Sequence, residues 1–253
     1  MRERAVQNSV QMHGCDMKCT KGRHMKTQLF QIGTIPAVLY GDSARQGYLF
    51  LHGQMGRKEE AEAFARVVCP AGYQVLSIDL PGHGVRQDRG EELLPWTAVP
   101  DIQAAVDWAE RHWNTVSLRA NSIGAYFAML AFADPGRALL VSPVLDMEGL
   151  IQTMMGWAGV TEDQLREEGE IPTSFGQTLS WKYLCWVREH PAHHWTCPVR
   201  ILYGSEDSMT ARQTVEEYAR RHHAALTVME GGEHWFHTPQ QLAVLREWEE
   251  RER

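Results

Sequence analysis

LRANSIGAYF, residues 118–127, places a short polar segment between two apolar runs. The residues before it are typical of a buried strand, and the small and apolar residues after it are typical of a buried helix. Asn121 and Ser122 therefore stand where a strand runs into a helix. A serine there has two interpretations: its hydroxyl caps the helix, or a tight turn holds it outward as a nucleophile. The stretch alone leaves both open.

On both sides of this junction, apolar strand-like runs alternate with helical patterns. Strands are expected at 27–40 (a hairpin around Gly33), 47–53, 73–80, 115–120, 138–144, 198–204 and 226–230, and helices at 58–68, 99–113, 122–133, 211–222 and 239–250. Such alternation predicts an α/β fold, with a mostly parallel sheet covered by helices on both faces.

Two segments depart from this rhythm. Residues 146–196 contain no convincing strand but many Met and Trp residues and an acidic run, which predicts a helical cap, or lid, inserted into a domain that covers 27–253. Residues 1–26 are polar and charged, and we expect them to form a flexible leader. They lack the apolar core of a secretory signal.

The composition restricts the classes of partner. A formal charge of −7 argues against nucleic acid and against an anionic membrane surface, because both favour a basic face. No run approaches the roughly 20 apolar residues that a membrane helix needs. We therefore expect a cytoplasmic protein that acts on a small molecule. The sequence makes no prediction of its oligomeric state.

The cysteines and histidines do not predict a disulfide framework or a metal site. The five cysteines are odd in number and scattered. His13, Cys15, Cys19 and His24 cluster near the start, but their spacing matches no trusted zinc pattern. We expect neither metal nor cofactor.

The pentapeptide Ala120-Asn121-Ser122-Ile123-Gly124 resembles the nucleophile elbow G-x-S-x-G of the α/β-hydrolase family, with alanine in place of the first glycine. The stretches LFLHGQMG (49–56) and IDLPGHG (78–84) resemble the His-Gly motif of that family and the strand and loop that follow it. Together with the candidate acid and base below, the resemblance spans about residues 27–250. It does not identify a subfamily.

The resemblance implies a serine nucleophile and an oxyanion hole. Ser122 would attack, and the backbone N–H groups of Gln54 and Ile123 would bind the developing negative charge. His52 would brace the loop without taking part in the reaction.

In this family the orienting acid and the base follow the serine, in that order. Asp207 lies three residues after Gly204, where a late strand ends. Its neighbour Glu206 is the obvious alternative, and Asp146, after an earlier strand, is another because some relatives place the acid there.

The base is expected in the loop after the last strand. His234 follows the two glycines of GGEHWFH and is the predicted base, with His237 as the alternative.

These residues imply acyl transfer by a serine hydrolase, most simply the hydrolysis of a carboxylic ester with a small or medium apolar or aromatic acyl group. The predicted substrate pocket draws on apolar residues beside the nucleophile and on the cap, namely Met55, Trp157, Trp181, Trp186 and Trp235; the alternative is that the cap aromatics only pack the insertion onto the sheet. A thioesterase, an acyl-peptidase or a C–C bond hydrolase would use the same three side chains. A non-catalytic small-molecule-binding protein of this fold is a further alternative.

Overall fold

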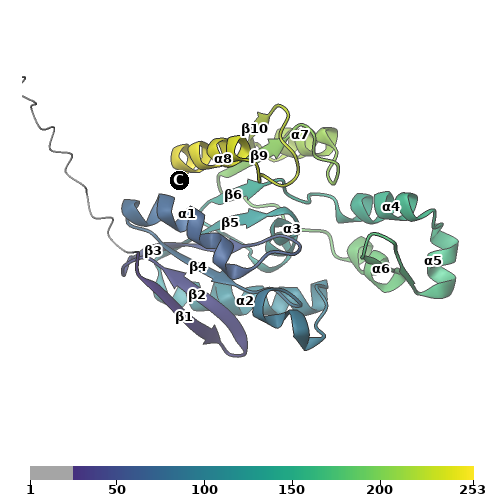
Figure 1. The fold of residues 1–253 in the computed structure, drawn as a ribbon, viewed down its shortest axis with the longest axis horizontal. Coiled ribbons are helices and arrows are strands. Elements are labelled where there is room, and N and C mark those ends of the chain that lie inside the picture. Colours follow the sequence, from purple (N-terminus) through teal and green to yellow (C-terminus); the bar gives the residue numbers. More distant parts are fainter. Residues whose placement is uncertain (1–24) are drawn as a thin grey trace, which may run out of the picture.

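A computed structural model describes residues 25–253, and these contain one eight-stranded sheet in the order β1-β2-β4-β3-β5-β6-β9-β10 (Figure 1). The strands are β1 (Thr27–Ile32), β2 (Ile35–Tyr40), β3 (Gln46–Leu51), β4 (Gln74–Ile78), β5 (Thr115–Asn121), β6 (Ala138–Val141), β9 (Val199–Gly204) and β10 (Ala225–Met229). From β4 to β10 every neighbouring pair is parallel. The mostly parallel sheet is thereby confirmed.

The N-terminal hairpin is the antiparallel part of the sheet. β1 pairs with β2 in the register Thr27 with Tyr40 and Ile32 with Ile35, around the tight turn that contains Gly33. β2 then pairs antiparallel with β4. The hairpin expected from the sequence is therefore present, and it forms one edge of the sheet.

Helices cover both faces of the sheet. They are α1 (Ala61–Val68), α2 (Pro95–His112), α3 (Ser122–Ala131), α7 (Arg212–Arg221) and α8 (Pro239–Glu252), with short 3-10 helices η1 (Lys58–Glu60), η2 (Cys69–Ala71) and η3 (Gly84–Arg89). Because successive side chains of a strand point to opposite faces, Leu49 and Leu51 of β3 pack with α2 and α3, whereas Tyr48 and Phe50 pack with α1 and α8.

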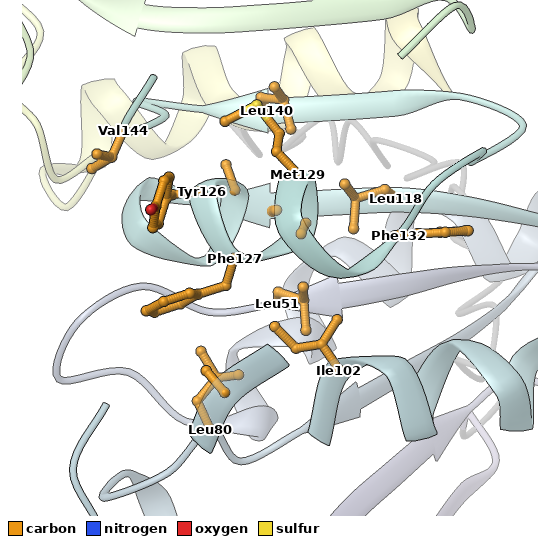
Figure 2. Packing of buried hydrophobic residues seen from close by; sticks show 14 of the residues in the cluster. Leu51, Leu80, Ile102, Leu118, Tyr126, Phe127, Met129, Phe132, Leu140 and Val144 are labelled. Carbon is orange, nitrogen blue, oxygen red and sulfur yellow. The ribbon is translucent and has the colours of Figure 1, made fainter. Parts of the chain in front are cut away.

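The core on the α2 and α3 face shows how the nucleophile's helix is held. Figure 2 shows Met129 of α3 on the side of Leu140 from the sheet, and Phe127 of α3 on the opposite side, with Leu51 from the sheet and Ile102 of α2. All five are buried or nearly so. A helix that is apolar on most sides, as α3 is, must be enclosed in this way.

Residues 146–196, which we call the cap, contain α4 (Met147–Ala158), α5 (Glu162–Glu168), β7 (Glu170–Pro172), β8 (Thr178–Ser180) and α6 (Trp181–Glu189). The expectation that this segment holds no strand was wrong, because β7 and β8 form a small antiparallel hairpin. Each strand has three residues, one of them a proline, so the hairpin carries no periodic apolar pattern that could reveal it. Figure 1 shows the cap extending beyond one end of the sheet.

The cap is joined to the body through its C-terminal part. The indole N–H of Trp195 donates to the carbonyl of Phe132 at 2.6 Å, and the backbone N–H of His193 donates to the carbonyl of Met129 at 3.0 Å. Tyr183 of α6 packs edge-on against Trp96 of α2. These contacts place α6 against α2, and the segment that follows α6 against the end of α3. No helix in the described part of the chain is both long and apolar enough to span a bilayer.

Candidate active site

Ser122 stands at the turn where β5 ends and α3 begins. Its φ angle of 48° lies in the left-handed region, which residues other than glycine adopt rarely and often at functional turns. The helix runs so close to β3 that a Cβ atom on Gly124 would lie 2.4 Å from the carbonyl oxygen of His52, so only glycine fits there. Ala120 is 0% exposed, and its methyl group is accommodated where the elbow motif has its first glycine.

The hydroxyl group of Ser122 meets the imidazole of His234. Its Oγ lies 2.8 Å from Nε2, and Nδ1 of the same ring lies 2.7 Å from Oδ2 of Asp207. Because a carboxylate only accepts hydrogen bonds, Nδ1 donates to Asp207 and Nε2 accepts from the serine. The side chain of Asp207 is 0% exposed and that of His234 is 11% exposed, so little water competes for these bonds. The arrangement can take a proton from Ser122.

The carboxylate of Asp207 is oriented by its own loop. Oδ1 accepts hydrogen bonds from the backbone N–H groups of Met209 at 2.8 Å and Thr210 at 3.1 Å. These bonds fix the plane of the carboxylate and leave Oδ2 for His234. Such support decides how accurately the imidazole is held.

Two glycines bring the loop of the acid and the loop of the base together. A Cβ atom on Gly204, at the end of β9, would lie 2.4 Å from the carbonyl oxygen of Gly232. The N–H of Glu206 donates to that same carbonyl at 2.8 Å. The loops that follow β9 and β10 are therefore in direct contact, and one carries Asp207 while the other carries His234.

The alternative acids have other environments. Glu206 is exposed, and its backbone rather than its carboxylate faces the site. Asp146 is the N-cap of α4 and accepts from the N–H of Gly149 at 2.9 Å. Neither carboxylate is hydrogen-bonded to His234, and Asp207 is.

The alternative base is also directed elsewhere. The side chain of His237 is 60% exposed, and its Nδ1 faces the carbonyl of Trp235 at 2.8 Å and the carboxylate of Glu233 at 3.3 Å. It makes no hydrogen bond to Ser122.

The loop after β3 is braced by a buried histidine. Nε2 of His52 accepts from the N–H of Leu80 at 3.1 Å, so its Nδ1 carries the proton and donates to the carbonyl of Gly53 at 2.8 Å. Burial is the main cause that lowers the pKa of His52 to about 4, so the ring is neutral near pH 7. A Cβ atom on Gly53 would come within 3.2 Å of the Cβ of Ser122, which puts the loop directly beside the nucleophile.

A buried ion pair anchors the next part of the same loop. Nζ of Lys58 lies 2.8 Å from Oδ2 of Asp79, and the backbone N–H of Lys58 donates to Oδ1 at 2.8 Å. Asp79 also accepts from the N–H of Val85. The aspartate of the IDLPGHG stretch thus connects the loop after β4 to the loop after β3, which is a structural role.

A pocket of about 340 Å³ opens beside Ser122 on the α1 and α8 side of the sheet. Its lining residues come from the loop after β3, from the ends of β5 and β6, and from the loop of the base with α8: Gly53, Gln54, Met55, Gly56, Glu60, Asn121, Ser122, Val141, His234, Trp235, Phe236 and Leu245. Met55 and Trp235 are 79% and 62% exposed, which places large apolar side chains at its open side.

The prediction that cap tryptophans line this pocket does not agree with the structure. Trp157 packs edge-on against Phe175 of the cap, Trp181 lies beside Arg166, and Trp186 stacks on His190. Since i and i+4 side chains of a helix are neighbours, the stacking of Trp186 within α6 needs no ligand. Met55 and Trp235 do line the pocket.

Sequence reasoning missed two polar residues of this pocket as site residues, Glu60 and Asn121. Asn121 directly precedes Ser122, and this position next to the predicted nucleophile was the sequence signal that could have identified it as a pocket residue. Glu60 lies in a charged run at the start of a helix, where a solvated side chain is the ordinary expectation, so no sequence signal distinguished it.

The structure offers no centre for a metal ion within residues 25–253, because no group of three or more His, Cys, Asp or Glu side chains is suitably arranged there. The cluster of His13, Cys15, Cys19 and His24 lies outside the described residues. The described cysteines, Cys69, Cys185 and Cys197, are free thiols.

A model of the α/β hydrolase family matches residues 48–247. The chain belongs to the α/β hydrolase family. The match includes the loop after β3, the elbow at Ser122 and the loops that carry Asp207 and His234. The family resemblance noted in the sequence is therefore confirmed, with the subfamily undetermined.

Solved structures of other α/β hydrolases share this fold. Est1E from Butyrivibrio proteoclasticus, in a structure with ferulic acid bound, is 18% identical, with a TM-score of 0.69 over 88% of this chain and 96% of that chain. A thioesterase domain from the curacin biosynthetic pathway is 15% identical, with a TM-score of 0.53 over 90% and 99%. XC6422 from Xanthomonas campestris, a serine hydrolase without a lid, is 16% identical, with a TM-score of 0.56 over 90% and 92%. No sequence among the curated proteins matches this chain.

Proposed function

We propose that this protein is a serine hydrolase that cleaves a carboxylic ester with a small or medium apolar or aromatic acyl group. The observation that carries the proposal is the hydrogen-bonded chain from Ser122 through His234 to Asp207 at the edge of a pocket. A serine that only caps a helix has no use for a histidine at 2.8 Å that is itself oriented by a buried carboxylate.

In the proposed reaction His234 removes the proton of Ser122 while Oγ attacks the ester carbonyl carbon. Asp207 keeps the imidazole in the correct tautomer and stabilises the imidazolium. The tetrahedral intermediate then collapses, and His234 returns the proton to the departing alkoxide, which leaves as the alcohol. A water molecule, deprotonated by His234, attacks the acyl-enzyme and releases the carboxylic acid.

The proposed oxyanion donors are the backbone N–H groups of Gln54 and Ile123. As the second residue of α3, Ile123 has an N–H with no acceptor inside the helix. Within residues 25–253 the N–H of Gln54 donates to no protein acceptor, and its loop abuts Ser122. One such donor contributes about 3 kcal/mol to the stability of the transition state in comparable sites.

The apolar part of the pocket supports the choice of an apolar or aromatic group. Met55, Trp235, Phe236 and Leu245 supply that surface, and a pocket of this kind binds ligands by burying apolar area. Est1E, which shares the fold, holds ferulic acid, an aromatic carboxylic acid, in its structure. An ester with an aromatic or short alkyl acyl group is therefore the first substrate class to test.

A fluorophosphonate probe tests the nucleophile directly. We expect covalent labelling of the wild-type protein and of the control Ser43→Ala, which changes an exposed serine far from the pocket, and no labelling of Ser122→Ala. A folded wild-type protein that is not labelled would contradict the proposal and favour a binding protein without catalysis.

A substrate panel then tests the bond type. The panel contains 4-nitrophenyl esters of graded chain length, aryl-acyl methyl esters, acyl-CoA thioesters and peptide anilides. We expect the highest kcat/KM on the esters. Preference for acyl-CoA or for anilides by a labelled protein would replace the ester assignment by thioesterase or acyl-peptidase activity.

A further inference from the structure

The orientation of the Asn121 side chain is determined by an arginine. Nη1 of Arg119 donates to Oδ1 of Asn121 at 2.5 Å. A guanidinium group only donates, so the oxygen end of the amide must face Arg119, and the NH₂ end must point away from it. Asn121 lines the pocket, and within residues 25–253 its Nδ2 has no protein acceptor. The NH₂ group is therefore a hydrogen-bond donor available to a ligand in the pocket.

A buried ion pair holds that arginine in place. Nε and Nη2 of Arg119 each lie 2.9 Å from Oε1 of Glu249 in α8, and both side chains are almost completely buried. The guanidinium also lies over the rings of Phe50 and Phe64. Removing two charges from water costs free energy, so a buried ion pair adds little to stability. Its best-documented role is to fix one particular arrangement of the surrounding side chains. Here the arrangement that results is a fixed amide beside the nucleophile.

Glu60 supplies an acceptor in the same pocket. Its Oε1 accepts from the N–H of Arg57 at 3.3 Å, and in the part of the chain that the structure describes no salt bridge neutralises its carboxylate. The residue as a whole is exposed, but burial of its carboxyl group raises the pKa of Glu60 above the ordinary value. The hydrogen bond from the backbone of Arg57 and the positive charges of Arg57 and Arg119 act in the opposite direction and lower this pKa. Glu60 and Asn121 both line the pocket beside Ser122.

We propose that Asn121 and Glu60 are specificity-determining residues that bind a hydroxyl group on the substrate. The amide of Asn121 donates to the hydroxyl oxygen, and the carboxylate of Glu60 accepts the hydroxyl hydrogen. The inference rests on the proposed function and adds the substrate class: an ester whose apolar or aromatic body carries a neutral hydroxyl group. The same carboxylate repels a substrate that carries a carboxylate at that position.

Two matched series of esters test the inference. The acyl series is methyl 3-phenylpropanoate, its 4-hydroxyphenyl analogue and its 4-carboxyphenyl analogue. The alcohol series is the acetate of 2-phenylethanol with the same two ring substitutions, so that either end of the ester can occupy the pocket. In one of the series we expect kcat/KM to be about tenfold higher for the hydroxyl compound than for the unsubstituted one, as one well-placed hydrogen bond gives.

Three variants separate recognition from stability. Glu60→Gln keeps the shape of the side chain and removes its charge. Asn121→Asp keeps an oxygen toward Arg119 and replaces the donor by an acceptor. Glu62→Gln is the control, because Glu62 lies outside the pocket and pairs with Arg66 at the surface.

The two pocket variants should have opposite effects on the carboxylate compound. We expect both to lose most of the preference for the hydroxyl compound. Glu60→Gln should raise kcat/KM for the carboxylate compound by about tenfold, because one like charge is gone, and Asn121→Asp should lower it further. Glu62→Gln should leave all ratios unchanged. A structural effect alone would change the three substrates of a series by the same factor.

The outcomes distinguish this inference from the proposed function. Ester hydrolysis with equal rates within both series, in the wild type and in both variants, would overturn the inference and leave the proposed function standing. If the wild type hydrolyses no ester, the proposed function fails, and the affinity of Ser122→Ala for the same esters by calorimetry decides the inference. Tighter binding of the hydroxyl compound, lost in Glu60→Gln, would support it, and equal binding would overturn it.

Discussion

His234 places its Nε2 2.8 Å from the Oγ of Ser122, although 112 positions separate the two residues in the sequence. The sheet explains the proximity. β5 and β10 are parallel to the strands between them, so the loop at the carboxyl end of each lies at the same edge. Ligand sites of open α/β sheets are found at this edge.

Replacing His234 by alanine should abolish ester hydrolysis while leaving the fold intact. Ser122 would lose its proton acceptor, and the loss of the base in such a group costs about 10⁴-fold or more in kcat. His237→Ala should keep nearly full activity, because the His237 ring is exposed and directed away from Ser122. Steady-state kinetics on a 4-nitrophenyl ester measures both. Full activity in His234→Ala with loss in His237→Ala would reverse the assignment of the base.

Asp207→Asn should reduce kcat by about 10³- to 10⁴-fold with little change in KM, because the amide cannot hold the imidazole in the tautomer that accepts from Ser122. Glu206→Gln is the matched control: its carboxylate is exposed, and we expect its kcat to stay within about twofold of wild type. Comparable losses in the two variants would show that the acid acts through the electrostatics of the whole loop and not through its bond to His234.

Local apolar patterns in the sequence were sufficient for most of the strands, whereas the positions of Ser122, Asp207 and His234 were predicted from the resemblance to the α/β-hydrolase family. Each of these residues follows an apolar run that ends in a turn, and parallel strands necessarily bring such turns to one edge. The boundaries were less predictable. α2 begins at Pro95, four residues before the helix expected from 99, because the first turn is set by a proline and not by apolar periodicity.

The pocket could not be predicted in the same way. The tryptophans of the cap indicate apolar surface but not the partner of that surface: in the structure Trp157 packs within the cap, whereas Trp195 is hydrogen-bonded to the body. The side chain of Asn121 is oriented by its hydrogen bond from Arg119. Arg119 is in turn held by Glu249, which lies 130 positions away in the sequence. A chain of contacts between side chains that distant leaves no pattern in a single sequence.

Gly124→Ala should destabilise the protein and impair catalysis. The added Cβ would lie 2.4 Å from the carbonyl of His52, so α3 or β3 must move, and such overpacking costs about 1–3 kcal/mol. Gly156→Ala in α4 is the matched control, because nothing lies within 4 Å of its added Cβ, and we expect a stability equal to or above wild type. Urea unfolding measures both. Wild-type stability in Gly124→Ala would mean that α3 and β3 are farther apart than the structure shows.

Trp235→Ala should raise KM for aromatic esters by about tenfold and have less effect on acetyl esters, because the indole lines the pocket and offers apolar area to a ring. Trp157→Ala should not change KM, since Trp157 packs against Phe175 in the cap. Both residues are at least half exposed, so neither change should reduce stability much. A rise in KM only in Trp157→Ala would show that the cap closes over Ser122 when substrate binds.

The stability of the protein should fall as the pH falls from about 6.5 to about 4, in part because of His52. Burial lowers the folded-state pKa of this residue to about 4, whereas the unfolded chain has the ordinary value of 6.5, so below pH 6.5 the unfolded state binds a proton that the folded state does not. The contribution is complete above pH 6.5, and the difference corresponds to about 3 kcal/mol lost by pH 4. His52→Gln removes the titration, so its free energy of unfolding, measured in urea at pH 7 and pH 4.5, should fall less than that of the wild type. An equal fall in the two proteins would mean that His52 is solvated or protonated in the folded state, and that the loop beside Ser122 is braced in another way.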